Sequence, residues 1–180
     1  GNNVLLTAGH CVEGLPDVLD GSGVHIGVGV QSRFRTGSPS VDMGLMDIDA
    51  EDIGRGYVDT RRGSTVPVTG ASSAPVGSAI CKAGNTTGWT CGAITNYGLT
   101  VNYSGSGGSV TPTRGLARAT VCTEGGDSGG AYISGSLAQG MTSGGPRAEC
   151  GFNQGNVGSY SFYQPVVDAA QRYGVTLTTS

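Results

Sequence analysis

The chain has 180 residues, a mass of 18.0 kDa, a net charge of −3 at pH 7 and an isoelectric point near 5.2. That length allows one substantial hydrophobic core or two small β-barrels that share an interface. The acidic balance argues against nucleic acid as a partner, and no apolar run approaches the roughly 18 residues that a membrane helix needs.

Glycine is unusually abundant, with 34 residues in 180, yet the sequence is neither collagen-like nor disordered. No Gly-X-Y period runs through it, and valine, isoleucine, leucine and tyrosine occur throughout its length. This composition favours an all-β domain with many turns.

Short apolar or alternating runs recur along the chain, and clusters of turn residues separate them. This spacing is typical of a sandwich or barrel rather than of βαβ units. The segment SGSGG at 104–108 lies between two such runs, so it is expected to form the tip of a hairpin. The predicted strands cover residues 3–8, 24–30, 41–48, 64–70, 77–83, 92–104, 115–122, 130–136 and 138–145.

The only predicted helix lies near the C-terminus, over residues 165–173. Pro165 suits the first helical position, where its missing N–H costs nothing, and Gly174 suits the end of the helix. Between them, Val166, Ala169, Ala170 and Tyr173 fall on one helical face.

Five cysteines occur, so at least one has no partner within the chain. The economical hypothesis is two disulfides, Cys81 with Cys91 and Cys122 with Cys150, in an oxidising, extracellular setting. Metal binding is not expected, because no CxxC pair is present and the chain has two histidines.

The segment CTEGGDSGG at 122–130 places an acid directly before a serine in a glycine frame. GDSGG matches G-x-S-x-G, the nucleophile elbow of α/β-hydrolases, in which the histidine follows the serine along the chain. Here His10 and His25 both precede Ser128, so that interpretation fails.

A serine nucleophile needs a neighbouring base, usually an imidazole that a carboxylate orients. The apolar run LLTAGHC ends with His10 and Cys11, and Asp42 lies in the run SVDMGLM, where a carboxylate is costly unless another group holds it. The candidate catalytic residues therefore follow the order His10, Asp42, Ser128.

That order, together with TAGHC and GDSGG, resembles the chymotrypsin-like serine proteases. The segments NTTGWTCGAI, YISGSLAQGMTSGG and FYQPV are similar to the bacterial secreted branch, the streptogrisins and α-lytic protease. The resemblance spans nearly the whole chain and implies two antiparallel six-stranded-type β-barrels with the site in the cleft between them. Residues 1–75 would form the first barrel, with His10 and Asp42, and residues 76–180 the second, with Ser128 and the C-terminal helix.

The resemblance also implies further strands ahead of TAGHC, with a cysteine that bridges to the one beside the catalytic histidine. Nine residues precede His10 in this chain. We therefore expect a first barrel that is incomplete at its start and an unpaired Cys11. The expected state is a monomer, and the alternative is a separate N-terminal fragment attached through Cys11.

By the same resemblance, the backbone N–H groups of Gly126 and Ser128 form the oxyanion hole, and Asp127 points into the protein. Its expected partner is Lys82, where the family usually has arginine. Because lysine cannot make the bidentate contact of arginine, the ion pair would be weaker. Activation would come from removal of a folding pro-segment, so the protein is expected to be a zymogen before processing.

The expected substrate site also comes from the family. Ser143, Gly144 and Gly145 would pair with an extended peptide, Ser143 would also bond to Asp42, and Thr142 would form the base of the specificity pocket. No aspartate occurs in ARATVC, so a preference for arginine or lysine is disfavoured. An uncharged pocket predicts cleavage after large apolar residues, while Arg147 is either a solvated loop charge or a group that favours an acidic side chain.

The predicted function is a secreted serine endopeptidase with polypeptide substrates, no cofactor, and protein protease inhibitors as further partners. The N-terminus lacks a signal-peptide pattern, so we expect a soluble, already processed chain without a membrane partner. The alternative is a non-catalytic binding or regulatory protein that keeps the protease fold. His25 receives no role, and the acidic stretch DIDAED at 47–52 is interpreted as a solvated loop rather than a calcium site.

Overall fold

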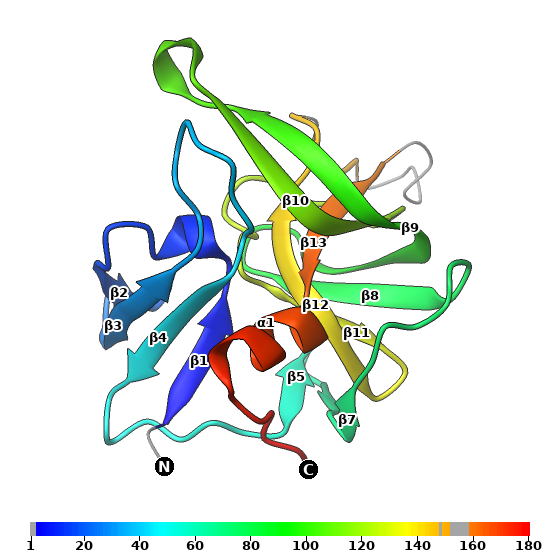
Figure 1. Ribbon diagram of the computed structural model, residues 1–180. Coiled ribbons are helices and arrows are strands. Elements are labelled where there is room, and N and C mark those ends of the chain that lie inside the picture. The colour runs from blue at the N-terminus through cyan, green and yellow to red at the C-terminus, as the bar shows by residue number, and fades with distance from the viewer. Residues whose placement is uncertain (1–2, 148, 152–158) are drawn as a thin grey trace.

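The computed structural model describes residues 3–147, 149–151 and 159–180, and it confirms a mostly β protein with two β units (Figure 1). The N-terminal unit is a four-stranded antiparallel sheet in the order β1-β4-β3-β2. In the described part of the chain, β1 and β2 are its edges. Its strands are β1 (Val4–Thr7), β2 (Asp17–Leu19), β3 (His25–Ser32) and β4 (Gly44–Ile48).

The C-terminal unit is a closed six-stranded antiparallel barrel. Its strands run in the order β11-β8-β9-β10-β13-β12, and the pairing of β12 with β11 closes the ring. They are β8 (Ala79–Gly84), β9 (Gly88–Ser104), β10 (Val110–Ala119), β11 (Ala131–Ser134), β12 (Leu137–Gly144) and β13 (Ser161–Pro165).

The connection between the two units contains a hairpin of β5 (Tyr57–Asp59) and β6 (Thr65–Pro67). It is followed by β7 (Gly70–Ala71), which adds to the barrel in parallel with β12. The C-terminal barrel therefore begins to take up the chain before residue 76, because β7 pairs with Leu137 and Ala138 at the start of β12.

Three strands lie outside the predicted runs: β2, β5 and β13. The first two have three residues each, too few for an alternating pattern to appear. The helix α1 (Val166–Tyr173) begins one residue later than predicted. Pro165 has an extended backbone (φ −57°, ψ 130°) and ends β13 instead, while Gly174 ends the helix in the left-handed region as predicted.

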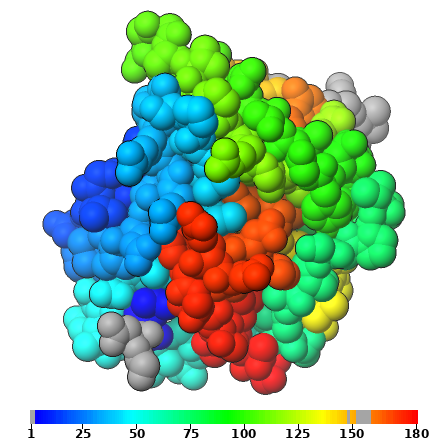
Figure 2. All heavy atoms as spheres, in the orientation of Figure 1, coloured from blue at the N-terminus to red at the C-terminus, as the bar shows by residue number. Residues whose placement is uncertain are grey.

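Two buried apolar clusters form the core of the described chain, and one of them joins the two units. One fills the barrel, where the rings of Tyr132 and Tyr163 stack with centroids 4.7 Å apart. The other joins Met43 of the N-terminal unit to Met141 of β12 and to Val166 and Ala169 of α1. In Figure 2 the C-terminal segment, in red, lies between the N-terminal sheet and the barrel and covers their junction on this face.

The long β9–β10 hairpin extends from the barrel beside the N-terminal unit, with a short 3-10 turn (Ser106–Gly108) at its tip (Figure 1). It bonds to the 34–40 loop: the N–H of Ser40 donates to Pro112, and that of Arg114 donates to Ser40. These backbone bonds fix the position of one unit relative to the other beside the cavity described below.

Two disulfides join Cys81 to Cys91, across β8 and β9, and Cys122 to Cys150, across the loops around the serine motif. Cys11 is free and exposed. Across the described ranges, no helix is long and apolar enough to cross a membrane.

Candidate active site

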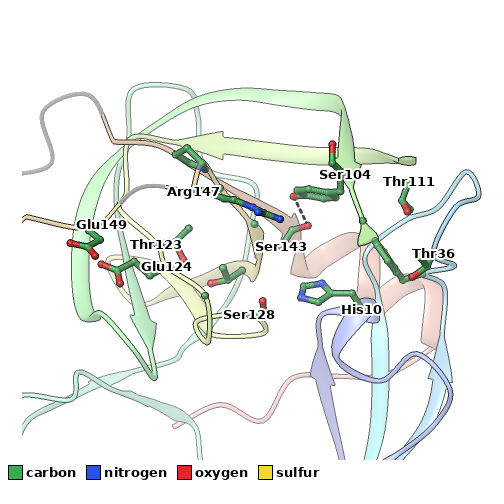
Figure 3. A pocket seen from close by; sticks show the side chains of 18 residues that line it. His10, Thr36, Ser104, Thr111, Thr123, Glu124, Ser128, Ser143, Arg147 and Glu149 are labelled. Carbon is green, nitrogen blue, oxygen red and sulfur yellow. Dashed lines mark hydrogen bonds between the residues drawn. The ribbon is translucent and has the colours of Figure 1, made fainter. Parts of the chain in front are cut away.

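A cavity of about 690 Å³ lies between the two units (Figure 3). The N-terminal unit contributes His10, which follows β1, and Phe34, which follows β3. The barrel contributes Ser128, Tyr103 of β9 and the end of β12. The sequence motifs around residues 10 and 128 thus meet at one cavity, as Figure 3 shows.

His10 lies in a single 3-10 turn (Gly9–Cys11) directly after β1, and this turn directs its ring to Asp42. The His10 Nδ1 atom is 2.9 Å from Asp42 Oδ2 and 3.1 Å from Oδ1, and the His10 backbone N–H also donates to Oδ1 at 2.9 Å. A carboxylate only accepts, so Nδ1 carries the proton and the lone pair of the neutral ring is on Nε2. In Figure 3 the imidazole faces the Ser128 hydroxyl.

The pKa of His10 reflects this pairing. Burial lowers it, but the hydrogen bonds and negative charges of Asp42 and the neighbouring Cys11 raise it more, from 6.5 to about 10. The Asp42 carboxylate therefore stabilises the imidazolium, which is the form that the ring takes after it accepts a proton.

Asp42 is fully buried, and the barrel holds it as well as the N-terminal unit does. Ser143 Oγ of β12 donates to Asp42 Oδ2 at 2.5 Å. Gln164 of β13 accepts the backbone N–H of Asp42 through Oε1 at 3.3 Å. Both units therefore set the position of the candidate catalytic carboxylate.

The loop that contains Ser128 presents two free amides. The N–H groups of Asp127, Gly129 and Gly130 donate to backbone carbonyls, whereas those of Gly126 and Ser128 have no acceptor among the described residues. Gly126 has φ +97°, in the region that favours glycine, and a Cβ there would collide with the Thr86 hydroxyl. Two unpaired amides beside a serine can stabilise an oxyanion.

Asp127 points away from the cavity, into the barrel, where Lys82 Nζ lies 2.9 Å from its Oδ2 atom. Lys82 and Asp127 are 0% and 1% exposed. The backbone amides of Thr86 and Thr87 donate to Oδ1, at 2.9 and 3.0 Å. They satisfy the carboxylate oxygen other than the one that Lys82 contacts.

The pKa values of this ion pair follow from burial and hydrogen bonding. Burial alone would raise the pKa of Asp127, but hydrogen bonds from Thr87, Lys82 and the Glu124 amide lower it well below 3.8. Burial also lowers the pKa of Lys82, and the Asp127 carboxylate opposes that effect. The carboxylate is therefore charged and fully hydrogen-bonded behind the Ser128 loop.

The part of the cavity beyond Ser128 is the candidate specificity pocket. Its lining includes Thr123 and Thr142, both buried and uncharged, and the strand end Ser143–Gly145 (residues 143–145). Arg147 also lines the cavity, and Figure 3 shows its side chain running toward Ser143. Glu124 and Glu149 line the far end of the cavity, where Glu124 accepts the backbone N–H of Cys150.

Sequence reasoning missed three residues of this site: Phe34, Tyr103 and Gln164. Phe34 packs edge-on against the His10 ring, with centroids 5.7 Å apart. The Tyr103 hydroxyl bonds to Ser143. Gln164 lies in the motif FYQPV, where a glutamine among mostly apolar neighbours could have indicated a buried polar contact.

The second histidine lies elsewhere. His25 is exposed on β3 of the N-terminal sheet, where its Nδ1 atom is 2.7 Å from Asp49 Oδ2. No group of three or more His, Cys, Asp or Glu side chains in the described part of the chain is arranged to hold a metal ion.

The comparisons of this sequence with known proteins agree on one protein family. The family model described as trypsin matches residues 1–172. Glutamyl endopeptidase 2 of Streptomyces griseus is 40% identical over 177 residues, which are 98% of this chain and 87% of that protein. Streptogrisin-C of the same organism is 36% identical over 179 residues, 99% of this chain but only 36% of that protein.

Solved structures agree with the sequence comparison. A glutamic-acid-specific serine protease that uses a histidine triad in substrate binding superposes with a TM-score of 0.83 at 35% identity, over 98% of this chain and 87% of that chain. Nocardiopsis protease also superposes with a TM-score of 0.83, at 36% identity, over 99% of this chain and 87% of that one.

Proposed function

The chain belongs to the trypsin family, and on that premise we propose that it is an endopeptidase that cleaves polypeptides through an acyl-enzyme formed on Ser128. The observation that carries this proposal is the buried Asp42 bonded to Nδ1 of His10, with the ring facing Ser128. This arrangement leaves the basic nitrogen of His10 directed toward a serine hydroxyl.

The proposed reaction begins when Ser128 Oγ attacks the peptide carbonyl and His10 Nε2 accepts its proton. The free N–H groups of Gly126 and Ser128 stabilise the oxyanion, and Asp42 stabilises the imidazolium. His10 then donates the proton to the leaving amine. A water molecule then attacks the acyl-enzyme carbonyl and gives a proton to His10. His10 passes a proton to Ser128 Oγ as the acyl–oxygen bond breaks, which releases the acid product.

The substrate would lie along the end of β12. Residues 143–145 line the cavity beside Ser128, at the end of β12. An extended peptide can add to such a segment as a β-strand, with its side chains alternating between the cavity and solvent. Pairing of this kind selects polypeptides in general and leaves residue preference to the pocket.

The proposed preference is for a large apolar residue before the scissile bond. Buried Thr123 and Thr142, together with Gly144 and Gly145, supply uncharged walls. The second candidate is an acidic residue, because Arg147 lines the same cavity and a glutamyl endopeptidase is among the relatives. The glutamic-acid-specific relative uses a histidine triad in substrate binding. Among the described residues that line this cavity, His10 is the only histidine, so binding of an acidic side chain would depend on Arg147.

A panel of peptide p-nitroanilides that differ only in the residue before the bond (Phe, Leu, Glu or Lys) distinguishes the two preferences. We expect the highest kcat/KM for Phe or Leu. If Glu is best, and Arg147→Ala lowers kcat/KM for Glu at least tenfold without changing that for Phe, the acidic preference replaces the apolar one.

A phosphonofluoridate tests the serine itself, since an unactivated serine reacts poorly. We expect one label per chain, on the peptide that contains Ser128, and none in Ser128→Ala or His10→Ala. Ser134→Ala is the matched control, because the Ser134 hydroxyl donates to Ala79 far from the cavity and labelling should persist. No label and no hydrolysis would favour the non-catalytic binding protein.

Secretion is part of the proposal and rests on the two disulfides, which form and persist in oxidising compartments. Expression in an oxidising compartment should give protein whose mass increases by two hydrogens per disulfide on reduction. Recovery of a fully reduced, active protein from a reducing cytoplasm would contradict this part of the proposal.

A further inference from the structure

We propose that Arg61 forms a subsite for an acidic side chain of the substrate on the leaving-group side, within the three residues that follow the scissile bond. The inference rests on the proposed peptidase function and adds a preference that the pocket beyond Ser128 does not provide. Arg61 lies in the turn of the β5–β6 hairpin, in the connection between the two units.

A second hollow opens beside Ser128. Its volume is about 230 Å³. Among the described lining residues, only Ser128 also lines the larger cavity. The serine therefore lies between two recesses of the surface, and a peptide bound at Ser128 can extend into both. The hairpin turn, the end of β8 and the serine loop line this hollow through Arg61, Ala83, Gly84, Asn85, Gly126, Asp127, Ser128 and Gly130.

The larger cavity takes the acyl side of the substrate in the proposed function. It contains the end of β12, beside which the peptide before the scissile bond would lie, and the candidate specificity pocket. The peptide after the bond must leave Ser128 away from these groups. Because the second hollow shares only Ser128 with the larger cavity, it is the recess open to the first residues of the leaving group.

The free charge in this hollow is positive. Arg61 and Asp127 are the charged residues of its described lining. Asp127 is 1% exposed and paired with Lys82, so its charge is neutralised. Arg61 is exposed, and no hydrogen bond or ion pair joins its guanidinium to another described residue. An acidic side chain in the hollow would thus meet one unpaired cation.

The backbone holds Arg61 in an uncommon conformation. Its φ of +60° lies in the left-handed region, which favours glycine and, after it, asparagine. The Asp59 carboxylate accepts the Arg61 backbone N–H at 2.7 Å, and the Thr60 N–H donates to the Ser64 carbonyl at 2.9 Å. The turn thus imposes this φ on an arginine whose guanidinium stabilises nothing in the described chain. Strained residues of this kind cluster at functional sites.

Contacts of the neighbouring residues fix the turn beside the β8–β9 hairpin. The Arg62 guanidinium donates to the Trp89 carbonyl at 2.9 Å. A Cβ at Gly88 would lie 3.9 Å from the Arg61 Cβ. Arg62 is therefore held on the start of β9, whereas Arg61 lines the hollow beside Ser128.

Two side chains of the hollow can donate to a carboxylate. The Arg61 guanidinium has N–H groups in a planar fork, which suits the two oxygens of a carboxylate. The exposed Asn85 side chain adds an amide NH₂ group to the same lining. Because Arg61 is exposed to solvent, water screens its charge and the expected preference is modest.

The test uses internally quenched peptides that share one sequence before the scissile bond. Asp, Asn or Lys is placed in turn at the first, second or third position after the bond. We expect kcat/KM to be about threefold higher for Asp than for Asn at one of these positions, and lowest for Lys. The difference should shrink in about 0.5 M NaCl, because salt screens an exposed ion pair.

Arg61→Asn removes the charge and retains a residue that tolerates positive φ, so it should abolish the preference for Asp. Arg61→Glu should reverse it and favour Lys. Arg62→Asn is the matched control, because it removes an equal charge from the adjacent position, where the guanidinium is bound to Trp89. The ratio of kcat/KM for Asp and Asn should not change in this control.

Binding to Ser128→Ala gives a second measurement that needs no turnover. Fluorescence anisotropy of labelled Asp and Asn peptides should give about threefold tighter binding for Asp, and Arg61→Asn should remove this difference. If no peptide is cleaved, the proposed function fails, while this binding measurement still decides the role of Arg61.

Three results would overturn the inference. The first is equal kcat/KM, or equal binding, for the Asp and Asn peptides at all three positions. The second is a preference for Asp that persists in folded Arg61→Asn. The third is an equal loss of that preference in Arg62→Asn, which would indicate a general effect of net charge rather than a subsite.

Discussion

Replacement of Lys82 by methionine tests whether the buried ion pair stabilises the Ser128 loop. Methionine has a similar volume, so the change leaves the Asp127 carboxylate without its cation but without a large cavity. Removal of one partner of a buried pair typically costs about 3–5 kcal/mol. Here Asp127 retains hydrogen bonds from the Thr86, Thr87 and Glu124 amides and two threonine hydroxyls. We therefore expect a loss near the lower end, about 3 kcal/mol.

The assay is urea unfolding at pH 7, followed by tryptophan fluorescence, on wild type, Lys82→Met, Asp127→Asn and the double variant. The double variant lacks both charges, so it should be more stable than the sum of the single effects predicts, by at least about 1 kcal/mol. The single variants should also lower kcat, since Asp127 lies between the two amides that we propose stabilise the oxyanion. A loss below about 1 kcal/mol in Lys82→Met, or additive single effects, would refute the reasoning.

Three further results follow from the site. Because Asp42 and Cys11 together raise the pKa of His10 to about 10, kcat/KM should be higher at pH 9 than at pH 7, and a profile that declines over that range would contradict this reasoning. Gly126→Ala forces an L-residue to φ +97° against the Thr86 hydroxyl, so kcat should fall about 100-fold, measured by steady-state kinetics on protein shown to be folded. The lowered pKa of Asp127 contributes stability that is fully present above pH 3.8 and declines as the pH falls below it, so the urea midpoint should drop between pH 4 and pH 2, and less so in Asp127→Asn.

The fold class and the candidate serine motif could both be predicted from the sequence because their signals are local. GDSGG is contiguous, since the proposed oxyanion loop needs glycine beside the serine within a few residues of backbone. Alternating runs separated by turn residues indicate strands because side chains alternate across a sheet. The closed barrel and the C-terminal helix confirm that prediction, with the helix one residue later than expected.

Strand pairing and the partners of buried polar groups were decided only by the tertiary structure. An isolated tyrosine in β9 has no local signature of its bond to Ser143, and Gln164 in β13 none of its bond to the Asp42 amide. The Lys82–Asp127 pair also shares its carboxylate with the backbone amides of Thr86 and Thr87, which no local pattern around Asp127 indicates. Local sequence thus determined which chemical groups the chain has, and long-range packing determined which of them meet, because hydrogen-bond partners are chosen by distance in space.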